Sequence, residues 1–246
     1  MHVLVRIQNF LISKYFRLTF GARSRNTNLV RLGTTYGGWW VPKSMVEMKS
    51  TNWAVISVGL GHDVSFDKEI LKCEISVIGL DPLDDCIQYA KNEIGSNEKF
   101  IAIKKGLWTH SGEIIFYPPK NSSHDSWSIA NSQSTETSDS KIFEVTSLSD
   151  IEEVYESILL DRKIYLKMDI EGSEKEIIDY IVDKKKSYDF LAVEMDYISL
   201  IPFFSISRRF EAIKKAKSQL KNLSTIGYQL THIENFNFFW SLHTND

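Results

Sequence analysis

The sequence predicts an α/β fold of the Rossmann-like type, in which helices cover both faces of a mostly parallel sheet. Short apolar runs alternate with amphipathic stretches along most of the chain, and this alternation is typical of parallel sheets. A glycine-rich turn directly follows the apolar run at residues 53–58. The last two apolar runs, between residues 228 and 240, are so close together that they predict an antiparallel hairpin.

The composition is that of an ordinary globular protein. The chain has 246 residues, of which 43% are hydrophobic and 25% are charged. Its two cysteines, Cys73 and Cys86, form no CxxC pair, and two cysteines do not make a disulfide scaffold at this size. We therefore expect a reducing, cytoplasmic compartment.

Positive charge is concentrated at the start of the chain. Seven basic residues and no acidic ones lie between Met1 and Met45, although the net charge of the whole chain is −3. Apolar residues recur there at helical spacing, at Leu4, Ile7, Leu11, Tyr15 and Leu18. Basic residues interrupt the apolar runs, so we expect neither a signal peptide nor a membrane span. We divide the chain into a basic amphipathic segment, residues 1–35, and a main domain, residues 36–246.

The first helix could contact either protein or a membrane surface. We expect it to pack on the domain or on a second subunit, which would make a homo-oligomer. Weak contact with a membrane surface is the less favoured alternative.

Strands and helices alternate after residue 50. Strands are predicted at residues 53–58, 75–80, 100–103, 113–117, 142–145, 164–168, 190–194, 228–233 and 236–240. Helices are predicted at residues 65–72, after Pro82, from Ser149, from Glu171 and at residues 208–223. A polar stretch, residues 121–140, cannot bury much apolar surface, and we predict a loop there.

Local signals support three of these helices. A first helical turn tolerates Pro82, and the helix dipole favours the two aspartates that follow it. Ser149 and Glu152 have the spacing of a capping box. The helix after Asp169 begins with glutamates and ends with lysines, which is the order that the dipole favours.

The first motif that indicates chemistry is Ser57-Val-Gly59-Leu-Gly61, directly after a predicted strand. Two glycines allow a tight turn and let a ligand approach the backbone closely. Asp81 ends the next strand, where its carboxylate can accept hydrogen bonds from both hydroxyls of a ribose or cap the following helix. Ligands of such sheets bind outside the carboxyl ends of the strands.

A nicotinamide dinucleotide is a second possible ligand of a G-x-G turn. Its fingerprint requires a third glycine three residues after Gly61, and Val64 stands there. A side chain at that point crowds a pyrophosphate but not a ligand without phosphates, such as S-adenosylmethionine. A nicotinamide-dependent oxidoreductase is therefore the weaker alternative.

The second motif is the run from Lys167 to Glu174, which follows another predicted strand. We expect Asp169, at the strand edge, to point into the cleft, and Glu171 and Glu174 to cap the next helix or to bind lysines. Glu194 ends the neighbouring predicted strand, so Asp169 and Glu194 could face each other. Two such carboxylates could hold Mg²⁺, or they could orient ligands without a metal.

Taken in order, these segments resemble FkbM-type methyltransferases. The matching segments are residues 55–61, 79–82, 105–108, 112, 145–148 and 167–174. The last of them looks like the D-x-E-G-x-E signature of that family, and the resemblance extends from about Tyr36 to His232. It implies a class I methyltransferase fold with a seven-stranded sheet, and methyl transfer from S-adenosylmethionine to hydroxyls of sugars or polyketides. It also implies that the cofactor is bound by Ser57, Gly59, Leu60, Gly61, Asp81, Pro82 and Gly106.

The catalytic candidates are Asp169, Glu194 and His232, all predicted near the carboxyl ends of strands. A hydroxyl must lose its proton as the methyl group arrives, so a general base is needed, and Asp169 is our first choice. Trp39 and Trp40 follow two glycines, and they either cover the ligands as an aromatic flap or belong to the core.

We therefore predict a methyltransferase that uses S-adenosylmethionine to methylate a hydroxyl of a sugar, a glycan or a related small molecule. Ser57 stands where many methyltransferases carry an acid, which leaves a second hypothesis, a degenerate methyltransferase fold that binds ligands without turnover. We expect no nucleic-acid partner.

Overall fold

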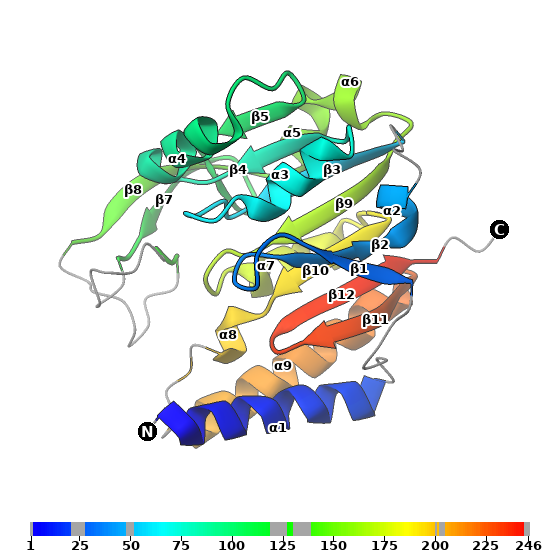
Figure 1. The fold of residues 1–246 in the computed structure, drawn as a ribbon. Helices are drawn as coiled ribbons and strands as arrows, with labels where there is room; N and C mark the ends of the chain where they lie inside the picture. The colour runs from blue at the N-terminus through cyan, green and yellow to red at the C-terminus, as the bar shows by residue number, and fades with distance from the viewer. Residues whose placement is uncertain are drawn as a thin grey trace.

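The computed structural model describes residues 2–20, 28–47, 52–118, 127–129, 139–199, 201 and 205–243. Most of the predicted polar loop, residues 121–140, lies outside these ranges, and within residues 2–20 the side chains are described from Phe10 onward, so those of Leu4 and Ile7 are not included. The described chain forms one large sheet with helices on both faces (Figure 1).

Seven strands form the large sheet, in the order β11-β12-β10-β9-β3-β4-β5. Their bounds are β3 (Trp53–Val58), β4 (Ser76–Leu80), β5 (Phe100–Ile103), β9 (Lys163–Met168), β10 (Phe190–Glu194), β11 (Tyr228–Glu234) and β12 (Asn237–Leu242). β12 pairs antiparallel with β11 and β10, and the other pairs are parallel. The predicted Rossmann-like fold, with seven strands and a C-terminal antiparallel hairpin, is therefore confirmed.

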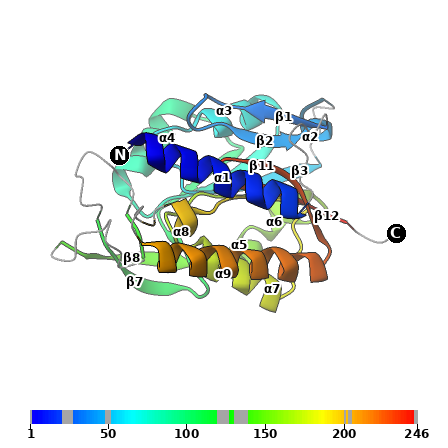
Figure 2. The same ribbon diagram turned by 90° about the horizontal axis from the view of Figure 1, so that it is seen from below.

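Helices cover the two faces of this sheet around separate cores (Figure 2). They are α1 (His2–Phe20), α2 (Lys43–Glu47), α3 (Ser65–Lys72), α4 (Asp84–Ile94), α5 (Leu148–Val154), α6 (Glu156–Leu159), α7 (Glu174–Asp183), α8 (Asp196–Ser199) and α9 (Ile206–Thr225). Core residues of α1, α5, α7 and α9 pack on one face, and those of α2 and α3 pack on the other. None of the helices in the described part of the chain is long and apolar enough to cross a membrane.

Two small sheets lie outside the main one. β1 (Leu29–Leu32) and β2 (Trp39–Pro42) form a hairpin, and β6 (Gly106–Leu107), β8 (Lys141–Thr146) and β7 (Gly112–Phe116) form a three-stranded sheet. The predicted strands near residues 113–117 and 142–145 are thus present, but they do not join the main sheet. The hairpin and the two-residue β6 were not predicted, because such short strands show too few alternating residues.

Two helices begin elsewhere than predicted. The N-cap of α5 is Ser147, whose hydroxyl accepts a hydrogen bond from the backbone of Asp150, and not Ser149. Helix α7 begins at Glu174 rather than Glu171, because Glu171 and Gly172 have left-handed backbones, with φ of 54° and 101°. Glu171 consequently stands in the loop after β9.

Helix α1 packs on the domain, as expected, but through a different face. Ile12 and Phe16 are buried in the same core as β12 and α9, and the Phe16 ring lies 5.3 Å from that of Phe238. The predicted apolar stripe is exposed instead at Leu11, Tyr15 and Leu18. α1 therefore has an apolar face on each side, and only one of them is covered by the domain.

Candidate active site

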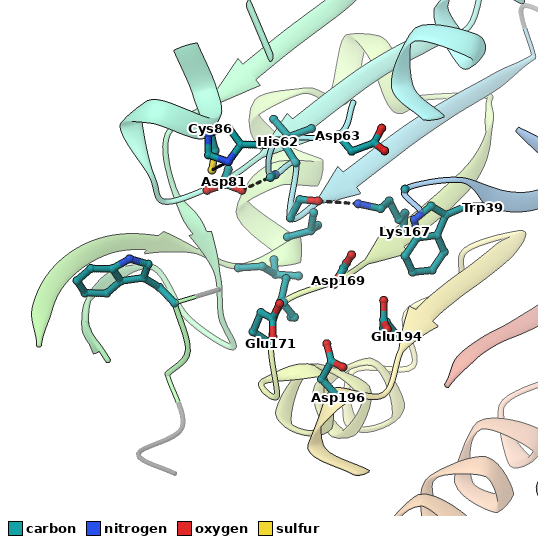
Figure 3. Close-up of a pocket in the computed structure, with 18 of the residues that line it drawn as sticks. Trp39, His62, Asp63, Asp81, Cys86, Lys167, Asp169, Glu171, Glu194 and Asp196 are labelled. Atoms are coloured by element: carbon teal, nitrogen blue, oxygen red, sulfur yellow. Dashed lines mark hydrogen bonds between the residues drawn. The ribbon is translucent and has the colours of Figure 1, made fainter. Parts of the chain in front are cut away.

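A cavity of about 1030 Å³ opens at the carboxyl ends of the parallel strands (Figure 3). Doubly wound sheets place their ligands at this edge. The loops after β3, β4, β9 and β10 line the cavity, together with parts of β2 and the turn between β11 and β12. Its volume lies at the upper end of the range for small-molecule sites, so there is room for a cofactor and an acceptor together.

The two sequence motifs touch at Gly59. Gly59 has a φ of 78°, and a Cβ added there would lie 1.8 Å from the carbonyl oxygen of Asp169. Gly61 also has a positive φ, 55°, but nothing lies within 4 Å of a Cβ added to it. Glycine is thus required at 59 for close contact between two loops, and it is favoured at 61 only by the backbone conformation.

Asp81 ends β4 and braces the glycine turn. Its Oδ2 accepts a hydrogen bond from the backbone of Gly61 at 3.1 Å, and its Oδ1 accepts one from the backbone of Leu83 at 2.9 Å. Each carboxylate oxygen has two acceptor sites, so these bonds leave room for ligand hydroxyls. Burial raises the pKa of Asp81, and the two backbone N–H groups oppose that rise.

Lys167 brings a positive charge into the site. Its ammonium donates a hydrogen bond to the carbonyl oxygen of Gly59 at 2.6 Å and lies 5.3 Å from the centre of the Trp39 ring. Sequence reasoning missed this residue, although a signal was present. A lysine in an otherwise apolar central strand must face a partner or a cavity, because an isolated buried charge is costly.

Four carboxyl groups gather at the other end of the cavity, those of Asp169, Glu171, Glu194 and Asp196 (Figure 3). Carboxylate oxygens of Asp169, Glu171 and Asp196 lie within 4.8 Å of one another. Asp169 and Glu194 follow or end the neighbouring strands β9 and β10, so the predicted juxtaposition is present. We call these four residues the acidic cluster.

Two members of the acidic cluster, Glu194 and Asp196, have raised pKa values. Burial, together with the negative charges of Asp169 and Glu171, raises the pKa of Glu194 to about 8. Burial and the charge of Glu194 likewise raise the pKa of Asp196 well above its usual range. A cluster of this kind favours ligands that are positively charged or that offer hydrogen-bond donors.

Glu174 supports the loop that carries the cluster. Its side chain is fully buried, and Oε1 accepts hydrogen bonds from the backbones of Ile170 at 3.2 Å and Gly172 at 3.0 Å. Glu174 therefore braces the loop before α7, contrary to the expectation that it caps the helix, and Glu171 lines the cavity. Burial raises the pKa of Glu174 to about 8.

The family model of the methyltransferase FkbM domain matches residues 41–224, three quarters of the chain. The chain belongs to the FkbM methyltransferase family. The matched range contains Gly59, Asp81, Lys167 and the whole acidic cluster. Family and fold together imply the use of S-adenosylmethionine, and they favour a methyltransferase over a nicotinamide-dependent oxidoreductase.

Among solved structures, this FkbM-family methyltransferase is similar to a fibrillarin pre-rRNA processing protein of Methanococcus jannaschii, with 8% sequence identity and a TM-score of 0.41. The match covers 79% of this chain and 68% of that chain. No curated protein sequence matches this chain significantly.

The residues at the first end of the cavity fit an adenosine-type cofactor. Gly59, Leu60, Gly61, Asp81, Pro82 and Gly106, all implied by the family resemblance, line the cavity. Ser57 is the exception, because it is fully buried beside Asp67 of α3 and does not line the cavity. Val64, at the position of the third dinucleotide glycine, is buried with Leu60 and helix α4.

His232 is not brought to the cavity of this FkbM-family methyltransferase. Its side chain is 5% exposed and packs between Trp40 and Phe239, with ring centres 5.0 and 5.6 Å away. β11 has a register shift between Leu230 and His232, so simple alternation could not predict which way the histidine faces. His232 therefore has no place in the site that we propose.

The two tryptophans before β3 belong to strand β2 and not to a flap. Trp39 is buried against Phe239, and it also lines the cavity beside Lys167. The backbone carbonyl of Trp40 accepts a hydrogen bond from the buried Tyr165 hydroxyl at 2.9 Å. Core packing thus describes both residues, and Trp39 is a fixed wall of the site.

The buried acids predict that the protein becomes less stable as the pH rises. The pKa values of Glu174 and Glu194, near 8, lie above the usual value of 4.5, so between these limits the folded state binds more protons than the unfolded state. Their contribution is fully present below the lower limit and is lost as the pH rises through the upper one. We expect the melting temperature to fall between about pH 5 and about pH 9.

Glu174→Gln should flatten this dependence, because glutamine imitates the protonated acid and keeps the Oε1 acceptor. Thermal denaturation across the pH range measures the effect. Glu153→Gln, on the exposed surface of α5, is the matched control and should keep the wild-type slope. A wild-type melting temperature that rises across this range would contradict the assignment.

Proposed function

We propose that this FkbM-family methyltransferase transfers a methyl group from S-adenosylmethionine to a hydroxyl of a sugar, a glycan or a related neutral molecule. The proposal rests on one observation, which is that a single cavity has two chemically different ends. One end has the glycine turn and Asp81, and the other has the acidic cluster. Family membership supports the methyl transfer, and the acidic cluster supports the choice of acceptor.

Charge and hydrogen bonding favour a neutral polyhydroxy acceptor. The acidic cluster repels phosphates and carboxylates, whereas its oxygens accept hydrogen bonds from hydroxyls. Asn237 also lines the cavity, and its buried Oδ1 has no hydrogen-bond partner among the residues that the structure describes. Such an acceptor atom is costly unless a ligand satisfies it. The aromatic rings of Trp127 and Phe116 add apolar walls that suit the faces of a sugar.

Asp169 is the residue best placed to take the proton of the acceptor hydroxyl. Its backbone is fixed against Gly59 in the cofactor end, and its carboxylate belongs to the acidic cluster. S-adenosylmethionine, when bound, supplies an electrophilic methyl group. Asp169 would orient the hydroxyl and accept its proton, and both effects accelerate a transfer of this type.

Glu194 supports Asp169 from the next strand. With a pKa of about 8 it is mostly protonated at neutral pH, so it would donate a hydrogen bond to Asp169 or to the acceptor. A general base works best when its pKa is close to the working pH, so Glu194 is the second candidate for that role.

A divalent cation is an alternative occupant of the acidic cluster. Asp169, Glu171 and Asp196 offer the oxygen ligands that Mg²⁺ prefers, and their oxygens lie close enough to share one ion. Mg²⁺ would then orient the acceptor oxygen and lower its pKa. Turnover that is lost in a chelator and restored by Mg²⁺ would favour this form of the mechanism over the one without metal.

Calorimetry with S-adenosylhomocysteine tests the cofactor end. We expect one molecule to bind per chain, and Asp81→Asn to weaken binding about ten- to a hundredfold, because hydrogen bonds to a charged acceptor are lost. Asp84→Asn is the matched control, since Asp84 is exposed in the first turn of α4 and does not line the cavity. Equal affinity in Asp81→Asn and in the wild-type protein would contradict the assignment of Asp81.

A further inference from the structure

Two neighbouring helices, α1 and α9, carry an unusual share of exposed apolar side chains. Both lie beside the edge strand β11 and are seen together from below (Figure 2). Among the described residues, six of the eleven large hydrophobic side chains that are exposed belong to these two helices. They are Phe10 (63% exposed), Leu11 (56%), Tyr15 (40%), Leu18 (75%), Ile206 (78%) and Phe210 (69%). We call these six residues, with the basic residues around them, the α1–α9 face.

The exposed apolar side chains are additional to those with which each helix packs into the core. Each helix already buries a different apolar stripe, Ile12 and Phe16 on α1 and Leu220 and Leu223 on α9. Phe10, Lys14 and Leu18 recur every four residues, so they share the outer side of α1. The two helices also form one continuous surface, because the Lys217 ammonium lies 5.5 Å from the centre of the Tyr15 ring.

The α1–α9 face is basic, although the chain as a whole has a net charge of −3. Six lysines and arginines of α1 and α9 are exposed or half-buried and form no ion pair within the described part of the chain, and the two helices contribute a single acid, Glu211, among described side chains. The six are Lys14, Arg17, Arg208, Lys214, Lys217 and Lys221. On α9 they continue the stripe of Ile206 and Phe210, since Lys214, Lys217 and Lys221 follow at helical spacing.

The charge of this face distinguishes between its possible partners. A second copy of the chain, related by a two-fold axis, would bring one basic face against another, and like charges oppose that contact. A nucleic acid would satisfy the charge but would leave Leu18 and Ile206 against water and phosphates. The interface of an anionic bilayer satisfies both features, because lipid headgroups attract lysine and arginine while apolar side chains enter the acyl boundary.

We propose that this protein binds anionic membrane surfaces through the α1–α9 face. The helices would lie in the plane of the interface, with Phe10, Leu18, Ile206 and Phe210 inserted and the basic side chains at the level of the headgroups. The proposal does not depend on the proposed methyl transfer, and its test requires neither cofactor nor acceptor. It places the enzyme where hydroxyl groups of membrane-attached molecules are within reach.

Sedimentation with vesicles tests the proposal. The full chain should sediment with vesicles of phosphatidylcholine mixed with phosphatidylserine at low salt, and not with phosphatidylcholine alone. Binding should weaken steeply as salt is added, because screening reduces the attraction between exposed charges. Absence of sedimentation with the mixed vesicles at low salt would overturn the proposal.

Two double variants separate the apolar and basic contributions. Phe10→Ser with Phe210→Ser, and Lys214→Glu with Lys221→Glu, should each reduce vesicle binding at least tenfold. Ile142→Ser is the matched control, because Ile142 is 64% exposed on β8 of the three-stranded sheet, and it should bind as the wild type does. Circular dichroism and thermal denaturation would confirm that the variants are folded, and each substitution would be tested singly if a double variant unfolds.

Self-association through this face, without vesicle binding, would contradict the proposal. If sedimentation equilibrium shows a dimer that the Phe10→Ser and Phe210→Ser pair dissociates, and if vesicles bind neither form, the α1–α9 face is a subunit interface and the membrane proposal is wrong. A monomer that binds the mixed vesicles supports it.

Discussion

Replacing Gly59 with alanine should destabilise the protein strongly and abolish cofactor binding. The new Cβ would lie 1.8 Å from the carbonyl oxygen of Asp169, a distance that no contact tolerates, so one of the two loops must move. Alanine is also strained at a φ of 78°. Either movement breaks the hydrogen bond from Lys167 to Gly59 or displaces Asp169.

The expected cost is about 3 kcal/mol or more, from steric overlap and backbone strain together. For a chain of this length that corresponds to a melting temperature lower by about 6–12 °C. Gly61→Ala is the matched control. It carries the strain of a positive φ without any overlap, so it should cost only about 1 kcal/mol. Thermal denaturation and calorimetry with S-adenosylhomocysteine measure both variants, and equal losses in the two would refute the tight contact between the motif loops.

Asp169→Asn should reduce turnover at least tenfold while the protein stays folded. Asparagine keeps the shape of the side chain but loses its charge and basicity, and a positioned general base contributes about 10²–10⁴-fold. We set the expected minimum at tenfold, below this range, because Glu194 can take over part of the role of the general base. Glu176→Gln, on α7 and outside the cavity, should retain nearly full turnover.

The pH profile of Asp169→Asn provides a second signature. The negative charge of Asp169 is one cause of the raised pKa of Glu194, so its removal should shift the limb of the profile that Glu194 governs to lower pH. This shift would show that Asp169 is charged beside Glu194, and the loss of turnover is the result that tests its role as the base. Near-normal turnover in Asp169→Asn would make Glu194 the first residue to replace, and a loss that Mg²⁺ partly restores would indicate a metal ligand rather than a base.

The sequence predicted the parts of this protein that depend on regular periodicity. The strands of the large sheet are short, nearly continuous apolar runs, and the carboxylates at their ends had to meet at one edge, as Asp169 and Glu194 do. Asp196, which lies two residues beyond Glu194, was missed because it belongs to the short helix α8 rather than to the strand. Lys167 was missed because it was read as part of a strand, and not as a charge that needed a partner.

Other differences between the prediction and the structure arise where the pattern of apolar and polar residues was ambiguous. α1 is apolar on two sides, and spacing alone cannot show that Phe16 is covered while Leu18 is exposed. Glu171 is a residue type that is common in the first turn of a helix, and only its left-handed backbone conformation places it outside α7. His232 follows a register shift, after which alternation no longer predicts the direction of a side chain. In each case, tertiary contacts decided between local alternatives that the sequence allowed equally.

The most direct test of the proposed function is to follow an isotopically labelled methyl group. The protein would be incubated with S-adenosylmethionine labelled in its methyl group and with panels of neutral sugars, of phosphorylated or uronic sugars, and of glycans, and the products would be analysed by mass spectrometry. We predict a labelled methyl ether on a neutral hydroxylated acceptor and no labelled product from the anionic ones. Binding of S-adenosylhomocysteine without any labelled product would indicate a binding module, and transfer to an anionic acceptor or to a nitrogen atom would contradict the role given to the acidic cluster.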